Sequence, residues 1–282
     1  MTISSMIAMT TSSPRAISSD GTPIASITVG KGPPVLVIPG ALSTAADLLP
    51  FARALGERYT VHVIERRGRG ASGPQGRDYS IERECEDVLA LQSLTGARFL
   101  VGHSYGGLVA LETALSSDCF ERVAVYEPGV AVNGSIGFDW MPAYARALQS
   151  GRLADAFVEF VIGTRPPGSR TAPRWLMKRL LALAIPRAER ARMYTLLDQN
   201  LREHEEVARL RDTYPRYAEL RCRVLLMYGG KASSAGTARA IERVAMVMPR
   251  ARVFVFPQLD HFGIQKKGAA DVARAVAEFL GD

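Results

Sequence analysis

The chain has 282 residues, of which 47% are hydrophobic and 22% charged, and this balance excludes a disordered, collagen-like or low-complexity protein. Its length suits one large domain or two small ones, and either can bury an adequate core. Lys and Arg number 35 against 28 Asp and Glu, a formal charge of +7, but no nucleic-acid-binding motif accompanies that charge. We therefore expect no nucleic-acid partner.

Cysteine usage and the chain start bear on location. Cys85, Cys119 and Cys222 lie far apart and are odd in number, which predicts buried free thiols rather than a disulfide framework. Residues 1–14 read as a flexible leader, with no Lys or Arg and no apolar run that suits a signal peptide. No stretch approaches the roughly 18 apolar residues of a membrane span. We expect a cytoplasmic protein, a monomer or homodimer, without a membrane span.

Alternating strand and helix patterns predict the fold class. Residues 15–18 and 24–29 predict an antiparallel hairpin at a sheet edge. Continuous apolar runs then suit strands buried on both faces of a parallel sheet: 35–38, 61–64, 99–101, 123–126, 224–227 and 253–256. Helical patterns lie between them: 44–56, from Ser80 onward, 106–116, 237–247 and 269–280. This order predicts an α/β protein with a mostly parallel sheet, an N-terminal antiparallel hairpin and helices on both faces.

About 90 residues between Glu127 and Cys222 interrupt the alternation with helical patterns alone. The predicted helices are 141–149, 153–162, 175–184 and 188–211, with a break at Arg165-Pro-Pro-Gly. A helical insertion at the carboxyl end of a parallel sheet would cover the place where such sheets bind ligands. We therefore expect a core of residues 15–128 and 222–282 and a helical cap of residues 129–221. Residues 139–221 hold 15 Lys or Arg and 10 Asp or Glu, so the cap is basic and favours anionic or polar-rimmed substrates.

The segment Gly102-His103-Ser104-Tyr105-Gly106 follows a short apolar strand and opens a helix, the context that gives the pattern G-x-S-x-G its meaning. Such a sharp turn exposes a serine nucleophile, and its flanking glycines keep the turn clear. The helix N-terminus faces a developing oxyanion, so the backbone N–H of Tyr105 is one candidate donor.

Together with Ile38-Pro-Gly-Ala41, Glu65-Arg-Arg-Gly-Arg-Gly-Ala-Ser72 and Asp260-His-Phe262, this turn resembles the α/β-hydrolase superfamily over nearly the whole chain. The resemblance implies the α/β-hydrolase fold and a second oxyanion N–H in the loop after the third strand, here that of Ala41. Pro39 stands where the family usually has His, but the donor is a backbone group. Ser104 argues against the haloalkane dehalogenase and epoxide hydrolase branches, which have Asp at this position.

A serine hydroxyl needs a base, and the chain has four histidines: His62, His103, His204 and His261. The first falls in a buried strand, the second adjoins Ser104 with a side chain that should leave the turn in another direction, and the third lies on a helix that we expect to be solvated. His261 follows the last strand, where the resemblance also implies the base.

The acid departs from the usual family pattern, because the loop at 229–237 contains no carboxylate. Glu127, in Tyr126-Glu127-Pro128, is the best replacement, and a Tyr-Glu-Pro segment with an acid-free later loop resembles one bacterial subgroup. The alternatives are that Glu127 is a structural carboxylate at the base of the cap, or that Asp260 is the acid. Neighbouring residues in an extended loop point apart, so Asp260 more often bonds backbone than orients His261.

The remaining motifs give weaker indications of function. Residues 68–73 satisfy G-x-G-x-x-G, but the next helix starts only near Ser80, so no dinucleotide cofactor is expected. Arg66, Arg67 and Arg69 can grip an anion, although a solvated or carboxylate-paired role is more common. No metal-ligand spacing occurs, so no metal is expected.

Trp140, Tyr144 and Trp175 are candidates to line an apolar substrate pocket, although aromatic residues at helical spacing more often pack a cap on itself.

We predict a cofactor-free serine hydrolase that cleaves a small-molecule carboxylic ester or lactone through an acyl-enzyme. Ser104 attacks, His261 transfers the proton, Glu127 orients His261, and the N–H groups of Ala41 and Tyr105 hold the oxyanion. The same triad can serve C–C bond hydrolysis or perhydrolase-type chemistry. The missing standard acid also leaves a non-catalytic ligand-binding protein on this scaffold open.

Overall fold

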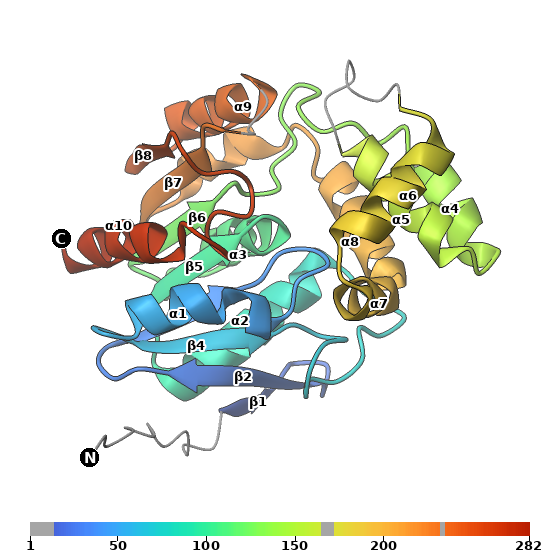
Figure 1. Ribbon diagram of the computed structural model, residues 1–282. Helices are drawn as coiled ribbons and strands as arrows, with labels where there is room; N and C mark the ends of the chain where they lie inside the picture. The colour runs from blue at the N-terminus through green and yellow to red at the C-terminus, as the bar shows by residue number, and fades with distance from the viewer. Residues whose placement is uncertain (1–13, 165–171, 232–234) are drawn as a thin grey trace, which may run out of the picture.

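The computed structural model describes residues 14–164, 172–231 and 235–282, and its centre is an eight-stranded sheet of order β1-β2-β4-β3-β5-β6-β7-β8 (Figure 1). The pairs β1–β2 and β2–β4 are antiparallel, and all other neighbouring strands pair in parallel. The strands are β1 (Arg15–Ile17), β2 (Pro23–Val29), β3 (Pro34–Ile38), β4 (Thr60–Glu65), β5 (Phe99–His103), β6 (Arg122–Tyr126), β7 (Arg223–Gly229) and β8 (Ala251–Phe256). The predicted α/β fold and edge hairpin are confirmed. The predicted leader, apart from Pro14, and the predicted break at Arg165 lie outside the described residues.

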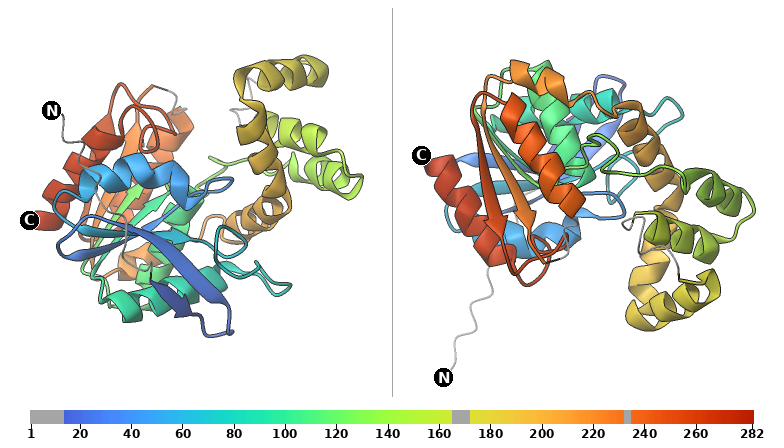
Figure 2. Two further views of the ribbon diagram at one scale, coloured as in Figure 1. Left: turned by 60° about the horizontal axis from the view of Figure 1, so that its bottom comes forward. Right: turned by 90° about the horizontal axis from the view of Figure 1, so that it is seen from above.

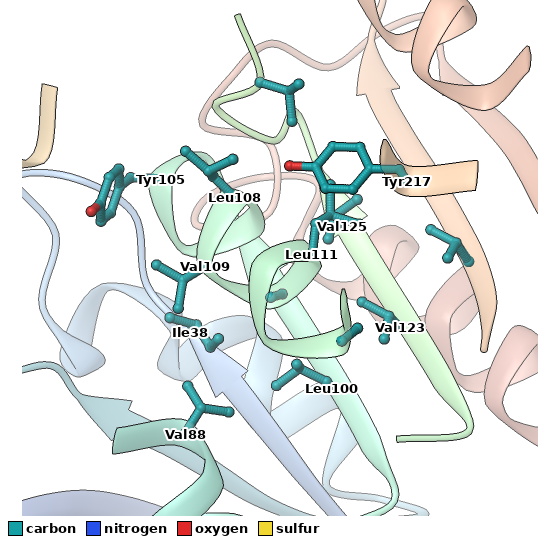
Figure 3. Close-up of a cluster of buried hydrophobic side chains, with 14 of the residues drawn as sticks. Ile38, Val88, Leu100, Tyr105, Leu108, Val109, Leu111, Val123, Val125 and Tyr217 are labelled. Carbon is teal, nitrogen blue, oxygen red and sulfur yellow. The ribbon is translucent and has the colours of Figure 1, made fainter. Parts of the chain in front are cut away.

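Helices cover both faces of the sheet (Figure 2). One face packs against η1 (Ala45–Leu48), α1 (Leu49–Leu55) and α10 (Ala269–Gly281), and the other against α2 (Ile81–Thr95), α3 (Tyr105–Ser116) and α9 (Ala235–Val247). Successive side chains of a strand point to opposite faces. In β3, Val35 and Val37 therefore join the cluster of α1 and α10, whereas Leu36 and Ile38 join that of α2 and α3. Figure 3 shows side chains of this second cluster packed around α3.

The last strand departs from the expectation of burial on both faces. In β8, Val253, Phe254 and Val255 are 40%, 44% and 39% exposed. The strand lies at the sheet edge with β7 as its one neighbour, so a continuous apolar run here does not indicate a central strand.

The insertion between β6 and β7 forms a separate group of helices, at the right of Figure 1. Its helices are α4 (Met141–Gln149), α5 (Leu153–Gly163), α6 (Arg174–Ala184), α7 (Arg187–Thr195) and α8 (Leu197–Arg209), and η3 (Tyr214–Glu219) follows before β7. The prediction of a single helix over 188–211 is wrong, because the chain turns at Leu196, whose side chain is buried among the insertion helices. The role of this insertion as a cap stays a prediction.

Two smaller expectations concern thiols and membranes. Cys85, Cys119 and Cys222 are free thiols, and the first and last are buried while Cys119 is half-buried. Within the described ranges, no helix combines the length and apolar character that a membrane span requires.

Candidate active site

Ser104 occupies the turn between β5 and α3 in an uncommon backbone conformation, with φ 54° and ψ −122°. Such strain persists only where the surroundings enforce it. Here the Ser104 N–H donates to the carbonyl of Tyr126 at 3.0 Å. The Ser104 carbonyl accepts backbone N–H groups from Gly107, Leu108 and Gly129 at 2.8, 3.2 and 2.9 Å. These bonds hold the serine at the carboxyl ends of the central strands.

Close backbone approach explains the glycines around this turn. A Cβ on Gly102 would lie 2.3 Å from the carbonyl oxygen of Gly106, and one on Gly106 would lie 2.3 Å from that of Ile38. A Cβ on Gly40 would lie 2.9 Å from the Cβ of Ser104. The loop after β3 therefore touches the serine, and both glycines of the G-x-S-x-G pattern are needed for space.

The two predicted oxyanion residues flank this serine. Ala41 follows Gly40 in the loop that touches Ser104, and Tyr105 is the first residue of α3. The first N–H groups of an α-helix have no acceptor within the helix, so they can bind an anion. Two backbone donors thus lie on loops that meet at Ser104.

His261 and Glu127 come together from segments 134 residues apart. The Nδ1 atom of His261 lies 2.8 Å from Oε2 of Glu127, whose side chain is 5% exposed. The other carboxylate oxygen, Oε1, accepts the backbone N–H of Gly229 at 2.9 Å. Glu127 itself has a positive φ of 43°, and its N–H donates to the carbonyl of Met227 at 2.8 Å. The end of β7 therefore fixes the carboxylate that faces the imidazole.

His103 links the serine turn to the His261 loop, a role that the sequence did not reveal. Its Nε2 donates to the backbone carbonyl of His261 at 2.9 Å, and the two rings lie 4.9 Å apart. The Nδ1 atom lies 3.4 Å from the side-chain nitrogen of Gln265. Burial and the neighbouring His261 lower the pKa of His103 to about 3. His103 is therefore a neutral structural histidine that ties the backbone of His261 to the residue before Ser104.

Asp260, the alternative acid, bonds backbone as expected. Its exposed Oδ1 accepts the N–H of Phe262 at 2.9 Å, and its carbonyl accepts the hydroxyl of Tyr126 at 2.7 Å. Of the two carboxylates, the structure brings Glu127 to Nδ1 of His261.

The prediction of a solvated helix around His204 is wrong. The imidazole packs edge-on against Trp140 and Phe160 at 5.2 and 5.4 Å, and burial lowers its pKa to about 4. Its neighbour Glu203 is fully buried at 1% exposure. The helix α8 packs between the other insertion helices and the core, so Glu203 is buried while Glu205 stays exposed.

The arginines after β4 are buried and paired with carboxylates, as one of the sequence interpretations held. Arg67 makes two hydrogen bonds of 2.7 Å to Asp87, and Arg66 donates from Nε to Glu84 at 2.7 Å. Arg69 is 3% exposed and reaches Glu203 of α8. The helix after the glycine-bearing loop begins at Ile81, as predicted.

Two of the three aromatic candidates pack the insertion on itself. Trp140 is 5% exposed and meets the ring of Tyr144 at 5.3 Å. The Tyr144 hydroxyl donates to the carbonyl of Leu197 at 2.8 Å and accepts from Asn200 at 3.0 Å. Trp175 is 63% exposed. The packing alternative therefore accounts for Trp140 and Tyr144, and a pocket role stays a prediction.

A cavity of about 390 Å³ lies at the amino ends of β6 and β7, with Asp118, Arg122 and Arg223 in its lining. This is the opposite end of the strands from Glu127, so it is separate from the candidate site. Within the residues that the structure describes, His, Cys, Asp and Glu form no group of three or more that could hold a metal ion.

The fold and the serine turn are those of a hydrolase scaffold, and the sequence profile of the alpha/beta hydrolase family matches residues 35–275. The chain belongs to this family. A solved alpha/beta hydrolase from Sphaerobacter thermophilus is 31% identical, with a TM-score of 0.80 over 95% of this chain and 100% of that one.

Two curated relatives match over shorter segments. An N-formylmaleamate deformylase of Pseudomonas putida is 31% identical over 110 residues, 37% of this chain and 41% of that protein. A pimeloyl-[acyl-carrier protein] methyl ester esterase of Aeromonas hydrophila is 33% identical over 128 residues, 40% of this chain and 49% of that protein. The matches thus span less than half the length of either relative.

Proposed function

We propose that the chain is a serine hydrolase that cleaves a carboxylic ester or lactone through an acyl-enzyme. The observation that carries the proposal is the 2.8 Å contact between Nδ1 of His261 and the buried carboxylate of Glu127, beside the strained turn of Ser104. The proposed nucleophile, acid and base all follow the carboxyl ends of parallel strands, β5, β6 and β8 respectively.

The hydrogen-bond pattern defines the protonation of the imidazole. A carboxylate can only accept, so the proton of a neutral His261 sits on Nδ1, and Nε2 carries the lone pair. That nitrogen takes the hydroxyl proton as Ser104 Oγ bonds to the acyl carbon, and the carbonyl oxygen becomes an oxyanion. The backbone N–H groups of Ala41 and Tyr105 stabilise that charge.

The second half returns the proton. The leaving alkoxide takes it from His261, the C–O bond breaks, and the acyl group stays on Ser104. Water then attacks the acyl carbon, loses a proton to His261 and releases the carboxylic acid, while Ser104 regains its proton.

Similarity to proteins named as a methyl ester esterase and a deformylase supports acyl chemistry as the reaction class. We also propose that residues 129–221 act as a cap over the site, and their excess of 15 basic over 10 acidic residues favours an anionic or polar-rimmed acyl substrate. Salt should then weaken the apparent affinity for an anionic ester more than for its neutral analogue.

A fluorophosphonate probe tests the nucleophile directly, since it phosphonylates an activated serine. We expect a covalent adduct at Ser104 in the folded wild type, and loss of labelling in Ser104→Ala. Ser117→Ala, at the other end of α3, is the matched control and should label normally. A panel of short and long acyl esters and lactones identifies the substrate class. A folded wild type that neither labels nor hydrolyses any of them would favour a binding protein and overturn the proposal.

A further inference from the structure

The carbonyl oxygen of Gly40 is held by two buried cations. Arg66 donates to it from Nη1 at 3.2 Å and Arg69 from its own Nη1 at 3.0 Å, and each side chain is 1% exposed. In a trans peptide the C=O and N–H point in opposite directions. Fixing the Gly40 oxygen therefore also fixes the direction of the Ala41 N–H, which our proposed function assigns to the oxyanion.

The two arginines differ in how they are anchored. Arg66 is paired with Glu84 of α2, and its guanidinium lies 4.7 Å from the centre of the Tyr105 ring. Arg69 has no such anchor in the core: within the part of the chain that the structure describes, Glu203 is the carboxylate to which it is hydrogen-bonded, and its Nε has no partner. The grip of Arg69 on the Gly40 carbonyl thus depends on the insertion.

Glu203 reaches both arginines from α8. Its Oε1 accepts from Arg66 Nη2 at 2.9 Å and from Arg69 Nη2. Two guanidiniums and the carboxylates of Glu84 and Glu203 form a neutral cluster, which is the condition for burying charges at this depth. Removal of the Glu203 charge leaves Arg69 buried beside a second cation, so Arg69 must move or draw in water.

Two further hydrogen bonds dock helix α8 on the core. Gln199 donates to the carbonyl of Gly68 at 3.0 Å, and Glu206 accepts the N–H of Ile81 at 3.0 Å. These contacts hold the helix in place, so a change at Glu203 alone leaves the insertion docked while it disturbs the clamp on Gly40.

We propose that Glu203 is a positioning residue, through which the insertion orients the Gly40–Ala41 peptide for oxyanion stabilisation by way of Arg69 and Arg66. The inference rests on the proposed function. A hydrogen-bonded chain polarises its members, so two guanidiniums on the carbonyl also make the Ala41 N–H a stronger donor. Substrate binding does not use this donor fully, whereas the tetrahedral intermediate does.

The test compares Glu203→Gln with Glu206→Gln, one turn along the same helix face. Loss of a whole oxyanion donor lowers kcat by about 10²–10³-fold, so a misdirected donor should lower it by about 10–100-fold. In Glu203→Gln we expect that decrease with KM within about threefold, and an equal loss of affinity for a boronic acid that forms a tetrahedral adduct. Glu206→Gln should keep kcat within about threefold.

A charge-balanced double variant separates positioning from stability. Arg69→Met with Glu203→Gln removes one charge of each sign, so thermal stability should recover relative to Glu203→Gln, but kcat should stay low because Arg69 no longer holds the Gly40 carbonyl. Recovery of kcat together with stability would overturn the inference, as would a Glu203→Gln enzyme with normal kcat.

A readout without turnover separates this inference from the proposed function. The Ala41 amide of the full chain, followed by ¹⁵N NMR hydrogen exchange, should exchange faster in Glu203→Gln than in wild type and Glu206→Gln. An inactive wild type that fails to label at Ser104 overturns the proposed function; unchanged Ala41 exchange overturns the clamp by itself.

Discussion

The Glu127→Gln variant would reverse the polarity of one hydrogen bond at nearly constant side-chain shape. The N–H of Gly229, 2.9 Å from Oε1, needs an acceptor, so the amide oxygen of the new side chain takes that position. The NH₂ group then occupies the place of Oε2, 2.8 Å from Nδ1 of His261. An NH₂ group can only donate, so the imidazole proton moves to Nε2, where it blocks transfer from Ser104.

The size of the effect follows from the triad chemistry. An acid-to-amide change that leaves the geometry intact but traps the wrong tautomer lowers kcat by about 10⁴-fold, or about 5 kcal/mol of transition-state stabilisation. We expect this loss in the saturated rate of ester hydrolysis, with KM within about threefold. The unfolding free energy should stay within about 1 kcal/mol of wild type, because the hydrogen bonds to Gly229 and His261 both keep a donor and an acceptor.

The control is Asp260→Asn, which keeps an oxygen for the N–H of Phe262. It should retain kcat within about threefold. A Glu127→Gln enzyme with a tenth or more of the wild-type kcat would refute the reasoning, and a large loss in Asp260→Asn would move the acid to position 260.

Three further predictions concern the scaffold. Gly102→Ala brings a methyl group within 2.3 Å of a backbone oxygen and should destabilise the chain by about 3 kcal/mol or prevent folding, whereas Gly129→Ala, with no neighbour closer than 3.5 Å, should unfold at nearly the wild-type urea concentration. The pKa of His103 is lowered to about 3, so below about pH 6.5 the unfolded chain binds a proton that the folded chain does not, and the free energy of unfolding decreases as the pH decreases. Between pH 7 and pH 5 this decrease should be about 2 kcal/mol smaller in His103→Gln than in wild type, and equal decreases in urea titrations would contradict this. Tyr144→Phe removes two buried hydrogen bonds and should cost about 1–2 kcal/mol, while Trp175→Ala at a 63% exposed position should change the urea midpoint of unfolding little; the reverse order would speak against the packing role.

Local sequence patterns were sufficient to predict most strands of the sheet and the helices that cover it. The run Val35-Leu-Val-Ile38 supplies alternate residues to the two cores, and a strand that is buried on both faces therefore has a continuous apolar sequence. The same pattern misled at Val253–Phe256, because apolar content cannot reveal that β8 has a neighbour on one side only. The helix pattern over 188–211 also hid a turn at Leu196, because the residues on both sides of it are helical.

Contacts between segments that are distant in the sequence could not be predicted from local patterns. Glu203 looked like one of several solvated glutamates, and its separation of 134 residues from Arg69 left no local signal for their contact. Burial of the pair depends on how α8 docks over the loop after β4, which is a property of tertiary packing. His103 was similar: its direction away from the turn was foreseen, but its bond to the His261 carbonyl depends on where the last loop passes.

The position of the proposed acid, in contrast, has a local physical reason. Strands β6 and β7 pair in parallel with Tyr126 opposite Met227, so the residues after them share the same edge. At Gly229 a Cβ would lie 2.4 Å from the carbonyl oxygen of Leu259, which leaves no room for any side chain, an aspartate included. What Gly229 can offer is its N–H, and Glu127 on the neighbouring strand is placed to accept it while facing His261. The glycine at the end of β7 and the glutamate at the end of β6 are therefore coupled: the glycine leaves no room for a carboxylate of its own, and its N–H holds the carboxylate of Glu127.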